Sequence, residues 1–157
     1  MCRKKVFNFF GQKIENKNFF NRFHAKNIAH RYSSGDILIN LDCDNILTEQ
    51  VIIEILRDFN ININYLLHCG YNEGFIVMSR YNFFLLGGYN EVMKNYGFED
   101  TDLVFRAFNH LKLLFRYFDE GLVKVIDQPK EIRFSNLEEK NIELASTQNY
   151  NVEIYNF

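Results

Sequence analysis

The sequence predicts an α/β fold, because segments with the apolar spacing of helices alternate with short apolar runs rich in β-branched residues. Its 157 residues are 47% hydrophobic, which is enough for one compact domain with a buried core. A helix, a tight turn and a buried strand follow one another early in the chain, a common α/β unit. We therefore expect a single domain over residues 1–157, in which the polar, Asn-rich residues 136–157 form a peripheral tail.

The first part of the chain predicts a short strand over residues 6–10 and a polar loop over residues 11–18. Apolar residues three and four positions apart then predict a helix over residues 25–32, which ends at two serines and a glycine. The apolar run that follows Gly35 predicts a buried strand. We expect this strand to deliver acidic side chains to its carboxyl end, where ligands of open α/β sheets bind.

The middle of the chain predicts a helix over residues 48–59, with a threonine at its start as the cap. Residues 60–64 alternate Asn with Ile and are expected as a strand or a loop edge. Residues 74–78 predict the next strand, and Ser79 caps a short helix that a pair of glycines ends.

The last part of the chain opens with a second acidic segment, residues 95–102, which begins a helix with an apolar face. Residues 122–126 predict a strand, and Pro129 marks the turn after it. Strands and helices therefore alternate along most of the chain.

The charge and cysteine content favour some classes of protein and exclude others. The net charge is −2 and the lysines and arginines are spread along the chain, so we expect no nucleic-acid partner. Cys2, Cys43 and Cys69 have no CxxC spacing and leave one cysteine unpaired, which favours a reducing compartment. Cys43 is expected to be a small core residue. Because no apolar run is long enough to span a bilayer, we expect a cytoplasmic protein without a transmembrane segment.

Asp42 and Asp44 form the first acidic cluster. Side chains alternate along an extended chain, so these two carboxylates are expected on one side of it. Two hard oxygen donors in this position can hold a divalent cation. Aspartates at the end of a strand also form turns and cap helices, so both interpretations stay open.

Glu99, Asp100 and Asp102 form the second acidic cluster, at the start of a predicted helix. Asp100 or Thr101 can cap that helix, and the positive end of the helix dipole favours the other acids. A catalytic role and a capping role are therefore both consistent with this segment.

Four short motifs follow one another between residues 23 and 111, which is more than half of the chain. They are Ala25, Lys26 and Asn27; Gly35 and Asp36 with the strand ending at Asp42, Cys43, Asp44 and Asn45; Gly87, Gly88, Tyr89, Asn90 and Glu91; and Tyr96, Gly97, Phe98, Glu99, Asp100, Thr101 and Asp102. In order and spacing they resemble the GT-A glycosyltransferases, more narrowly the family 2 and galactosyltransferase-related group.

The resemblance implies a GT-A-like (Rossmann-like) mixed sheet flanked by helices, of which this chain is the carboxyl-terminal catalytic portion. Members of the group carry a nucleotide-binding βαβ region before the matched segment, whereas only residues 1–22 precede it here. We therefore expect that part to be shortened or missing, and a partner chain to be able to supply it.

The resemblance also implies roles for individual residues. The metal, Mn²⁺ or Mg²⁺, is expected at Asp44 and Asp42, with Asp42 also approaching the donor, and the catalytic base is expected at Asp100, with Glu99 as the second choice. Asn90 stands where the family has an acid. The remaining residues expected to bind donor or acceptor are Asn27, Asn45, Gly87, Gly88, Tyr89 and Glu91.

The function that this resemblance implies is a metal-dependent, inverting glycosyltransferase of the hexosyltransferase type. It would transfer a sugar from a nucleotide-sugar donor, a UDP-sugar, to a hydroxyl of a carbohydrate or glycan acceptor. The metal stabilises the leaving diphosphate, and a carboxylate takes the proton of the acceptor hydroxyl. The alternatives are a truncated, non-catalytic remnant or subunit that binds carbohydrate or a separate nucleotide-binding partner, and a different metal-dependent phosphate enzyme.

The other polar residues carry weaker signals. Lys26 and Arg31 are interpreted as part of a solvated helix face, although either can meet a phosphate. His24, His30 and His68 have no zinc spacing and are expected to be satisfied or surface histidines.

Overall fold

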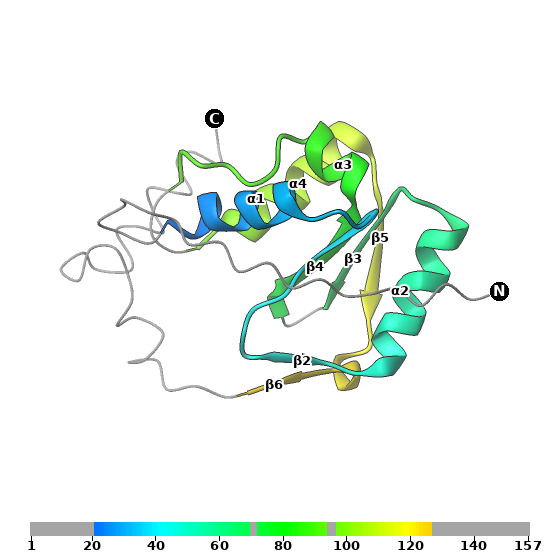
Figure 1. The fold of residues 1–157 in the computed structure, drawn as a ribbon. Helices are drawn as coiled ribbons and strands as arrows, with labels where there is room; N and C mark the ends of the chain where they lie inside the picture. The colour runs from blue at the N-terminus through cyan, green and yellow to red at the C-terminus, as the bar shows by residue number, and fades with distance from the viewer. Residues whose placement is uncertain (1–20, 70–71, 94–96, 127–157) are drawn as a thin grey trace.

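The computed structural model describes residues 21–69, 72–93 and 97–126 (Figure 1). The predictions for residues 6–10, 11–18, 129 and 136–157 lie outside these ranges. In chain order the elements are α1 (Arg22–Tyr32), β1 (Ile37–Asn40), β2 (Asn45–Leu47), α2 (Glu49–Ile61), β3 (Tyr65–Cys69), β4 (Asn72–Ser79), α3 (Arg80–Leu85), α4 (Glu99–Leu111), β5 (Leu114–Phe118), a 3₁₀ turn (Glu120–Leu122) and β6 (Val123–Val125).

The sheet is mixed, in agreement with the predicted α/β class. Its four strands have the order β1-β4-β3-β5; β4 is antiparallel to both of its neighbours, and β5 is parallel to β3. A second, two-stranded sheet pairs β2 with β6 in antiparallel register, with Asn45 opposite Val125.

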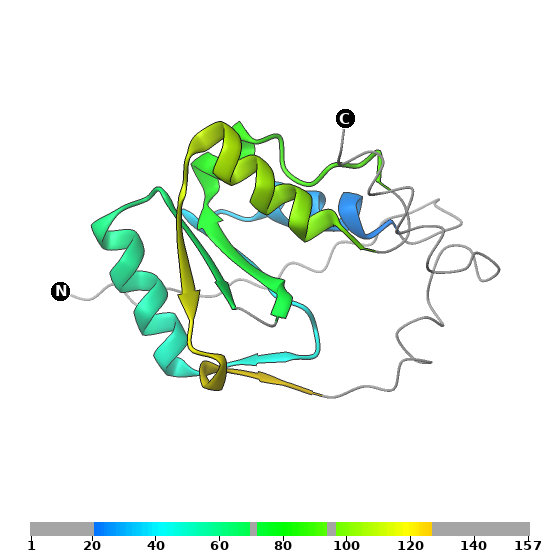
Figure 2. The same cartoon turned by 180° about the vertical axis from the view of Figure 1, so that it is seen from behind.

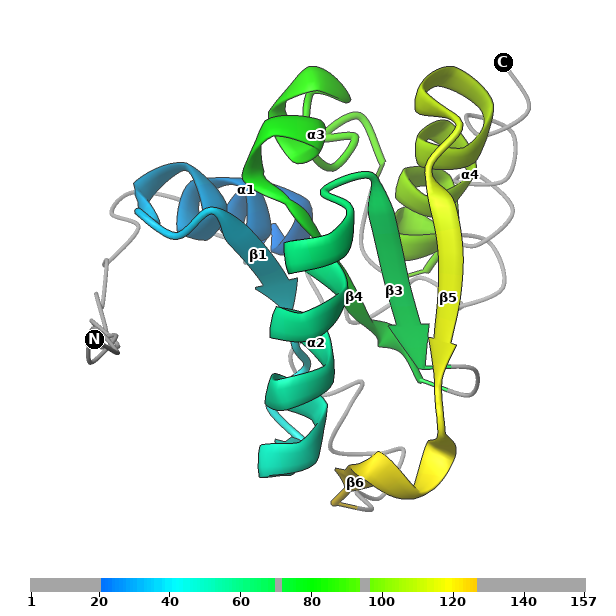
Figure 3. The ribbon, with the colours of Figure 1, turned by 90° about the vertical axis from the view of Figure 1, so that its right-hand side faces the viewer.

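The sheet is covered by helices on both faces. Because side chains alternate along a strand, neighbouring residues of one strand pack against opposite helical layers. In β4, Phe75 and Val77 pack with the buried residues of α2, whereas Ile76 and Met78 pack with those of α1, α3 and α4. Figures 1 and 2 show α2 on one side of the sheet and the other three helices on the opposite side. Figure 3 shows the same layers with α2 in front.

The predicted helix boundaries are largely confirmed. Ser79 accepts a hydrogen bond from the backbone N–H of Asn82 at 3.2 Å and so caps α3. Gly87 and Gly88 follow this helix with φ of 81° and 77°, a conformation that glycine adopts without strain. Helix α1 begins earlier than expected, because the Asn21 side chain caps it by accepting from the His24 N–H at 2.9 Å.

Two strands of the sheet were not predicted. The run that becomes β5 directly continues the apolar pattern of α4. The helix ends nevertheless, because Lys112 adopts a left-handed conformation with φ of 52°. Glycine is the usual sequence signal for such a helix end, and it is not present at this position. Strand β3 has consecutive buried leucines, one for each helical layer, so its pattern lacks the alternation that marks a half-buried strand. Residues 60–64, expected as a strand or loop edge, end α2 and form a loop.

The first acidic cluster lies on a turn, so the expected extended geometry is wrong. Strand β1 ends at Asn40, and the N–H of Asn45 donates to the carbonyl of Asp42 at 3.0 Å. An aspartate at the first position of such a turn is the turn-forming alternative left open above. Cys43 is exposed within this turn, so its assignment to the core is also wrong. Across the described ranges, no helix is long and apolar enough to cross a membrane.

Candidate functional site

The candidate site is built around the first turn of α4, which carries three buried acids: Glu99, Asp100 and Asp102. The chain enters this helix through Gly97 and Phe98, which both have positive φ, 94° and 66°. Glu99 and Asp100 face α1, whereas Asp102 pairs with Arg106 of α4 itself. The positive end of the helix favours all three negative charges. Neither Asp100 nor Thr101 is the cap, because the N-cap position is Phe98, which makes no side-chain cap bond.

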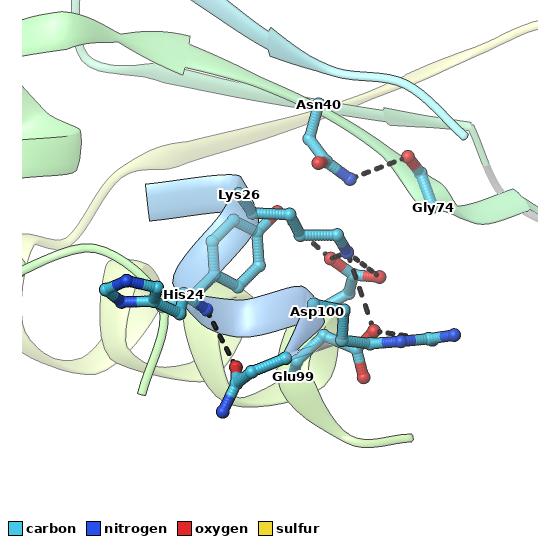
Figure 4. A network of polar contacts seen from close by, with 9 residues as sticks. His24, Lys26, Asn40, Gly74, Glu99 and Asp100 are labelled. Atoms are coloured by element: carbon cyan, nitrogen blue, oxygen red, sulfur yellow. Dashed lines mark hydrogen bonds and ion pairs between the residues drawn. The ribbon is translucent and has the colours of Figure 1, made fainter. Parts of the chain in front are cut away.

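Asp100 is held by groups from two other segments (Figure 4). Lys26 of α1 donates to both carboxylate oxygens, with Nζ 3.2 Å from Oδ1 and 3.4 Å from Oδ2. The hydroxyl of Tyr89 donates to Oδ1 at 3.1 Å. Burial raises the pKa of Asp100 to about 6, against the lowering effect of Lys26. A carboxylate with this pKa is suited to accept a proton near neutral pH.

The pKa of Glu99, the neighbour of Asp100, is shifted in the opposite direction. Its Oε1 accepts from Arg22 at 3.2 Å and from Lys26 at 3.5 Å. Burial alone raises the pKa of Glu99, but the charges of Lys26 and Arg22 outweigh it, so this pKa lies below its ordinary value. We call Arg22, Lys26, Tyr89, Glu99 and Asp100 the α4 cluster. Two adjacent carboxylates with pKa values pushed apart are a signature of acid–base sites.

Asp42 approaches this cluster across Gly74 of β4. A Cβ atom on Gly74 would lie 2.0 Å from Oδ2 of Asp42, so a larger residue at this position would require the Asp42 carboxylate to move. Asn40 donates to the carbonyl of Gly74 at 2.9 Å and fixes the same stretch of backbone. Figure 4 shows the Asn40–Gly74 pair on the strands beside the Lys26 side chain.

Acids of both acidic clusters act on the phenol of Tyr89. Burial raises the pKa of Tyr89 well above its usual value, and the charges of Asp100, Glu99 and Asp42 add to this effect. Tyr89 therefore stays protonated and donates to Asp100 rather than accepting from it. The fold thus brings Asp42 and Asp100, which are far apart in the sequence, within electrostatic reach of one ring.

The loop that follows α3, residues 87–91, is fixed to α1 by Asn27. Its side-chain Nδ2 donates to the Tyr89 carbonyl at 2.9 Å, and its Oδ1 accepts from the Tyr89 N–H at 2.8 Å. A Cβ on Gly88 would lie 2.5 Å from that Oδ1, so this position needs glycine for space as well as for its φ. Glu91 accepts from Asn27 at 2.9 Å and pairs with Nδ1 of His24 at 2.8 Å. Asn27 therefore positions the loop, and a contact between Asn27 and a ligand stays a prediction.

The same loop is fixed to α4 by Arg106. Its guanidinium donates to the carbonyls of Leu86 and Gly88, both at 2.8 Å, and to Oδ2 of Asp102. A planar fork with several donors suits this arrangement better than a lysine would. Gly88 and Tyr89 are thus held from both helices before any ligand arrives.

Asp44 and Asn45 belong to the far end of the turn and to β2. The carbonyl of Asp44 accepts from the Ile126 N–H at 2.6 Å, which ties the turn to the end of β6. Asn45 is buried, and among the described residues neither polar atom of its side chain has a hydrogen-bond partner. Contact between Asp44 or Asn45 and the α4 cluster stays a prediction.

The donor set for a metal is incomplete in protein groups alone. Over the described part of the chain, no three His, Cys, Asp or Glu side chains form a group that could hold a metal ion. Asp42 and Asp44 supply carboxylate oxygens, the ligand type that Mg²⁺ and Mn²⁺ prefer. A cation held there would need further oxygens from phosphate or water, as Mg²⁺ often has.

Sequence reasoning missed the cationic residues of the site. Lys26 was assigned to a solvated helix face, yet its side chain is only 17% exposed and it lies between two acids. Arg22 and Lys26 are four residues apart in one helix, and so are Asp102 and Arg106. Such spacing predicts a shared helix face. It could have indicated these pairs, but not which residues they would meet across the fold.

The chain matches no model of a known protein family, and no curated protein is significantly similar to it. Its function is therefore inferred from the residues of the site and their geometry.

Proposed function

We propose that this protein is the catalytic portion of a GT-A glycosyltransferase, which transfers a sugar from a UDP-sugar to a hydroxyl of a carbohydrate acceptor. One observation supports this most. The buried Asp100 is held by Lys26 and Tyr89, and the charge of Asp42 reaches the same Tyr89, so residues from all four resembling motifs interact through one cluster.

The architecture is compatible with this proposal. A mixed sheet flanked by helices is the coarse plan of Rossmann-like nucleotide-binding folds, and the acidic turn follows the carboxyl end of β1. Under this proposal, a partner chain can supply the elements that bind the nucleoside.

Asp100 would act as the general base. As the acceptor oxygen forms its bond to the anomeric carbon, the acceptor O–H bond breaks and its proton passes to Asp100. The bond from the anomeric carbon to the diphosphate breaks on the opposite face, and the diphosphate leaves with the electron pair. This displacement inverts the anomeric carbon. A base with a pKa of about 6 is largely ionised at neutral pH and so can accept the proton.

Asp42 and Asp44 would hold Mn²⁺ or Mg²⁺ together with donor phosphates and water. When bound, the cation stabilises the negative charge of the leaving diphosphate. The space over Gly74 that receives the Asp42 carboxylate supports this assignment, because a larger residue there would displace the carboxylate.

The proposal is tested by incubating the protein with radiolabelled UDP-hexoses, Mn²⁺ and a panel of sugar acceptors. We expect transfer that disappears with EDTA and in Asp44→Ala, while Glu49→Ala, an exposed acid on the opposite helical layer, keeps the wild-type rate. Transfer that survives EDTA would overturn the metal role. Release of phosphate without sugar transfer would identify a different phosphate enzyme.

A binding role without transfer is the second candidate. It is favoured by the charge balance of the α4 cluster, in which two cations already face two carboxylates. Calorimetry separates the two candidates. A carbohydrate that binds with equal affinity to wild type and to Asp100→Asn, in a protein that shows no transfer with any UDP-hexose, would support binding alone.

A further inference from the structure

We propose that Lys26 is a positioning residue that fixes the Asp100 carboxylate and leaves its Oδ2 as the atom that accepts the proton. This inference rests on the proposed role of Asp100 as the base. It extends that role by naming the accepting atom and the residue that aims it.

The two oxygens of Asp100 are not equivalent. Oδ1 accepts from the Tyr89 hydroxyl at 3.1 Å and from Lys26 at 3.2 Å. Within the described ranges, Oδ2 accepts from Lys26 alone, at the longer distance of 3.4 Å. Each carboxylate oxygen offers about two lone-pair positions, so Oδ1 is filled and Oδ2 keeps one position for a substrate hydroxyl.

Lys26 is itself held in place, so it can hold Asp100 in one orientation. Its ammonium lies 4.8 Å from the centre of the Tyr89 ring and 3.5 Å from Oε1 of Glu99. The neighbouring Phe23 is fully buried, and Asn27 is bonded to the Tyr89 backbone, which anchors this part of α1. A lysine side chain is usually flexible, but these contacts hold the Lys26 ammonium at one position.

The charge balance allows Asp100 to change ionisation without leaving Lys26 unpaired. When a proton arrives on Oδ2, Lys26 keeps Glu99 as its anionic partner. The groups that act on Asp100 directly are Lys26 from α1, Tyr89 from the loop and Glu99 from its own helix. Arg22 pairs with Glu99, and the charge of Asp42 acts on Tyr89. Of these, Lys26 and Tyr89 favour the carboxylate, and Glu99 disfavours it.

The test is a carboxyl NMR titration of protein labelled with ¹³C-aspartate, in which the Asp100 signal is identified by its loss in Asp100→Asn. We expect Lys26→Met to move the Asp100 midpoint upward by about 1–3 pH units, the effect of removing an adjacent opposite charge. Lys26→Arg should restore most of the shift, and Glu99→Gln should move the midpoint downward. Lys124→Met removes the same charge from an exposed position on β6 and should leave the midpoint unchanged.

An unchanged midpoint in Lys26→Met would overturn the proposal. If that variant does not fold, Lys26→Gln, which keeps a donor but loses the charge, takes its place under the same criterion. The titration needs no substrate, so it remains informative if wild type shows no transfer, which would count against the proposed function alone. Where transfer is measured, kcat of Lys26→Met should fall by about 2-fold to about 100-fold at pH 7, the loss of ionised Asp100 that a rise of 1–3 pH units produces, recover with rising pH and leave KM nearly unchanged.

Discussion

Two buried acids on opposite faces of the sheet, Asp100 and Asp58, are held in different ways. Asp58 of α2 is 2% exposed, and both of its oxygens face arginines: Oδ1 lies 3.2 Å from Arg57 Nε, and Oδ2 pairs with Arg116 of β5. Arg116 also donates to Glu54 at 3.3 Å, so it ties α2 to the edge of the sheet. We call Glu54, Arg57, Asp58 and Arg116 the α2 cluster.

The difference between the clusters is why we propose chemistry at the α4 cluster and a structural role for the α2 cluster. In the α2 cluster an arginine stays charged at all relevant pH values and each Asp58 oxygen has its own cationic partner, so the arrangement is static. In the α4 cluster one lysine serves both oxygens of Asp100, and burial raises the pKa of that acid to about 6. Burial of a charge alone therefore does not indicate a functional site; the proposal for Asp100 rests on a carboxylate oxygen with a free lone-pair position together with a pKa near neutrality.

Among substitutions that test the difference between the two clusters, we expect the largest effect to be a loss of activity when Asp100 is replaced. Asp100→Asn removes the proposed base, and we expect the transfer rate to fall by roughly 10²–10⁴-fold. Stability near neutral pH should not fall, because the amide needs no buried charge and Lys26 keeps Glu99 as its partner. The measurement is the transfer rate together with a urea unfolding curve. Loss of the fold without a specific loss of rate would show that the α4 cluster is structural as well.

Asp58→Ala should have the reverse profile. Removing one partner of a buried ion pair typically costs about 3–5 kcal/mol, so the free energy of unfolding should fall strongly. The transfer rate per folded molecule should be kept, because α2 covers the other face of the sheet. Arg57→Ala is the control; its side chain is 55% exposed, so its loss should stay within about 1 kcal/mol. A rate loss in Asp58→Ala that folding does not explain would contradict the contrast.

The dependence of stability on pH should separate the two neighbours in the α4 cluster. The pKa of Asp100 is raised from 3.8 to about 6, so its contribution is present below pH 4 and is lost as pH rises to about 6. Its size is at most a few kcal/mol, since one pKa unit corresponds to about 1.4 kcal/mol. The pKa of Glu99 is lowered, so its contribution is present above its ordinary pKa and is lost as the solution becomes more acidic.

This prediction is checked by urea unfolding of wild type and Asp100→Asn between pH 4 and 7. The unfolding free energy of wild type, measured relative to that of Asp100→Asn, should decline as pH rises through this range. A flat difference would mean that Asp100 titrates as an ordinary acid. The transfer rate should rise with pH over the same interval, because the base ionises.

A smaller effect is expected at the glycines of the loop that supports the α4 cluster. Gly88→Ala strains a positive φ and pushes its Cβ against Asn27, so about 1–3 kcal/mol of stability and part of the activity should be lost. Gly87→Ala has a similar φ but meets no atom within 4 Å, which makes it the matched control. Thermal unfolding should rank Gly88→Ala as the less stable variant, and equal losses would show that φ strain alone matters.

The local signals in the sequence predicted much of the fold. Ser79 caps α3 and the paired glycines end it. The apolar faces expected for α2 and α4 are confirmed in large part, although Leu56 and Phe108 are exposed. These features depend on residues a few positions apart, and so the sequence carries them directly. Strands β3 and β5 were not predicted. Strand β3 is buried on both faces and so lacks alternation, and β5 follows a helix end that no glycine marks.

The sequence by itself determined which acids are present, Asp42, Asp44, Glu99 and Asp100, and the helix start that favours the last two. Only the tertiary structure decided that Lys26, 74 residues from Asp100, holds its carboxylate, and that Gly74 makes room for Asp42. The reason is physical. The pKa of a carboxyl and the free lone pairs of its oxygens depend on burial and on charges that act through space, and these come from segments that only folding brings together.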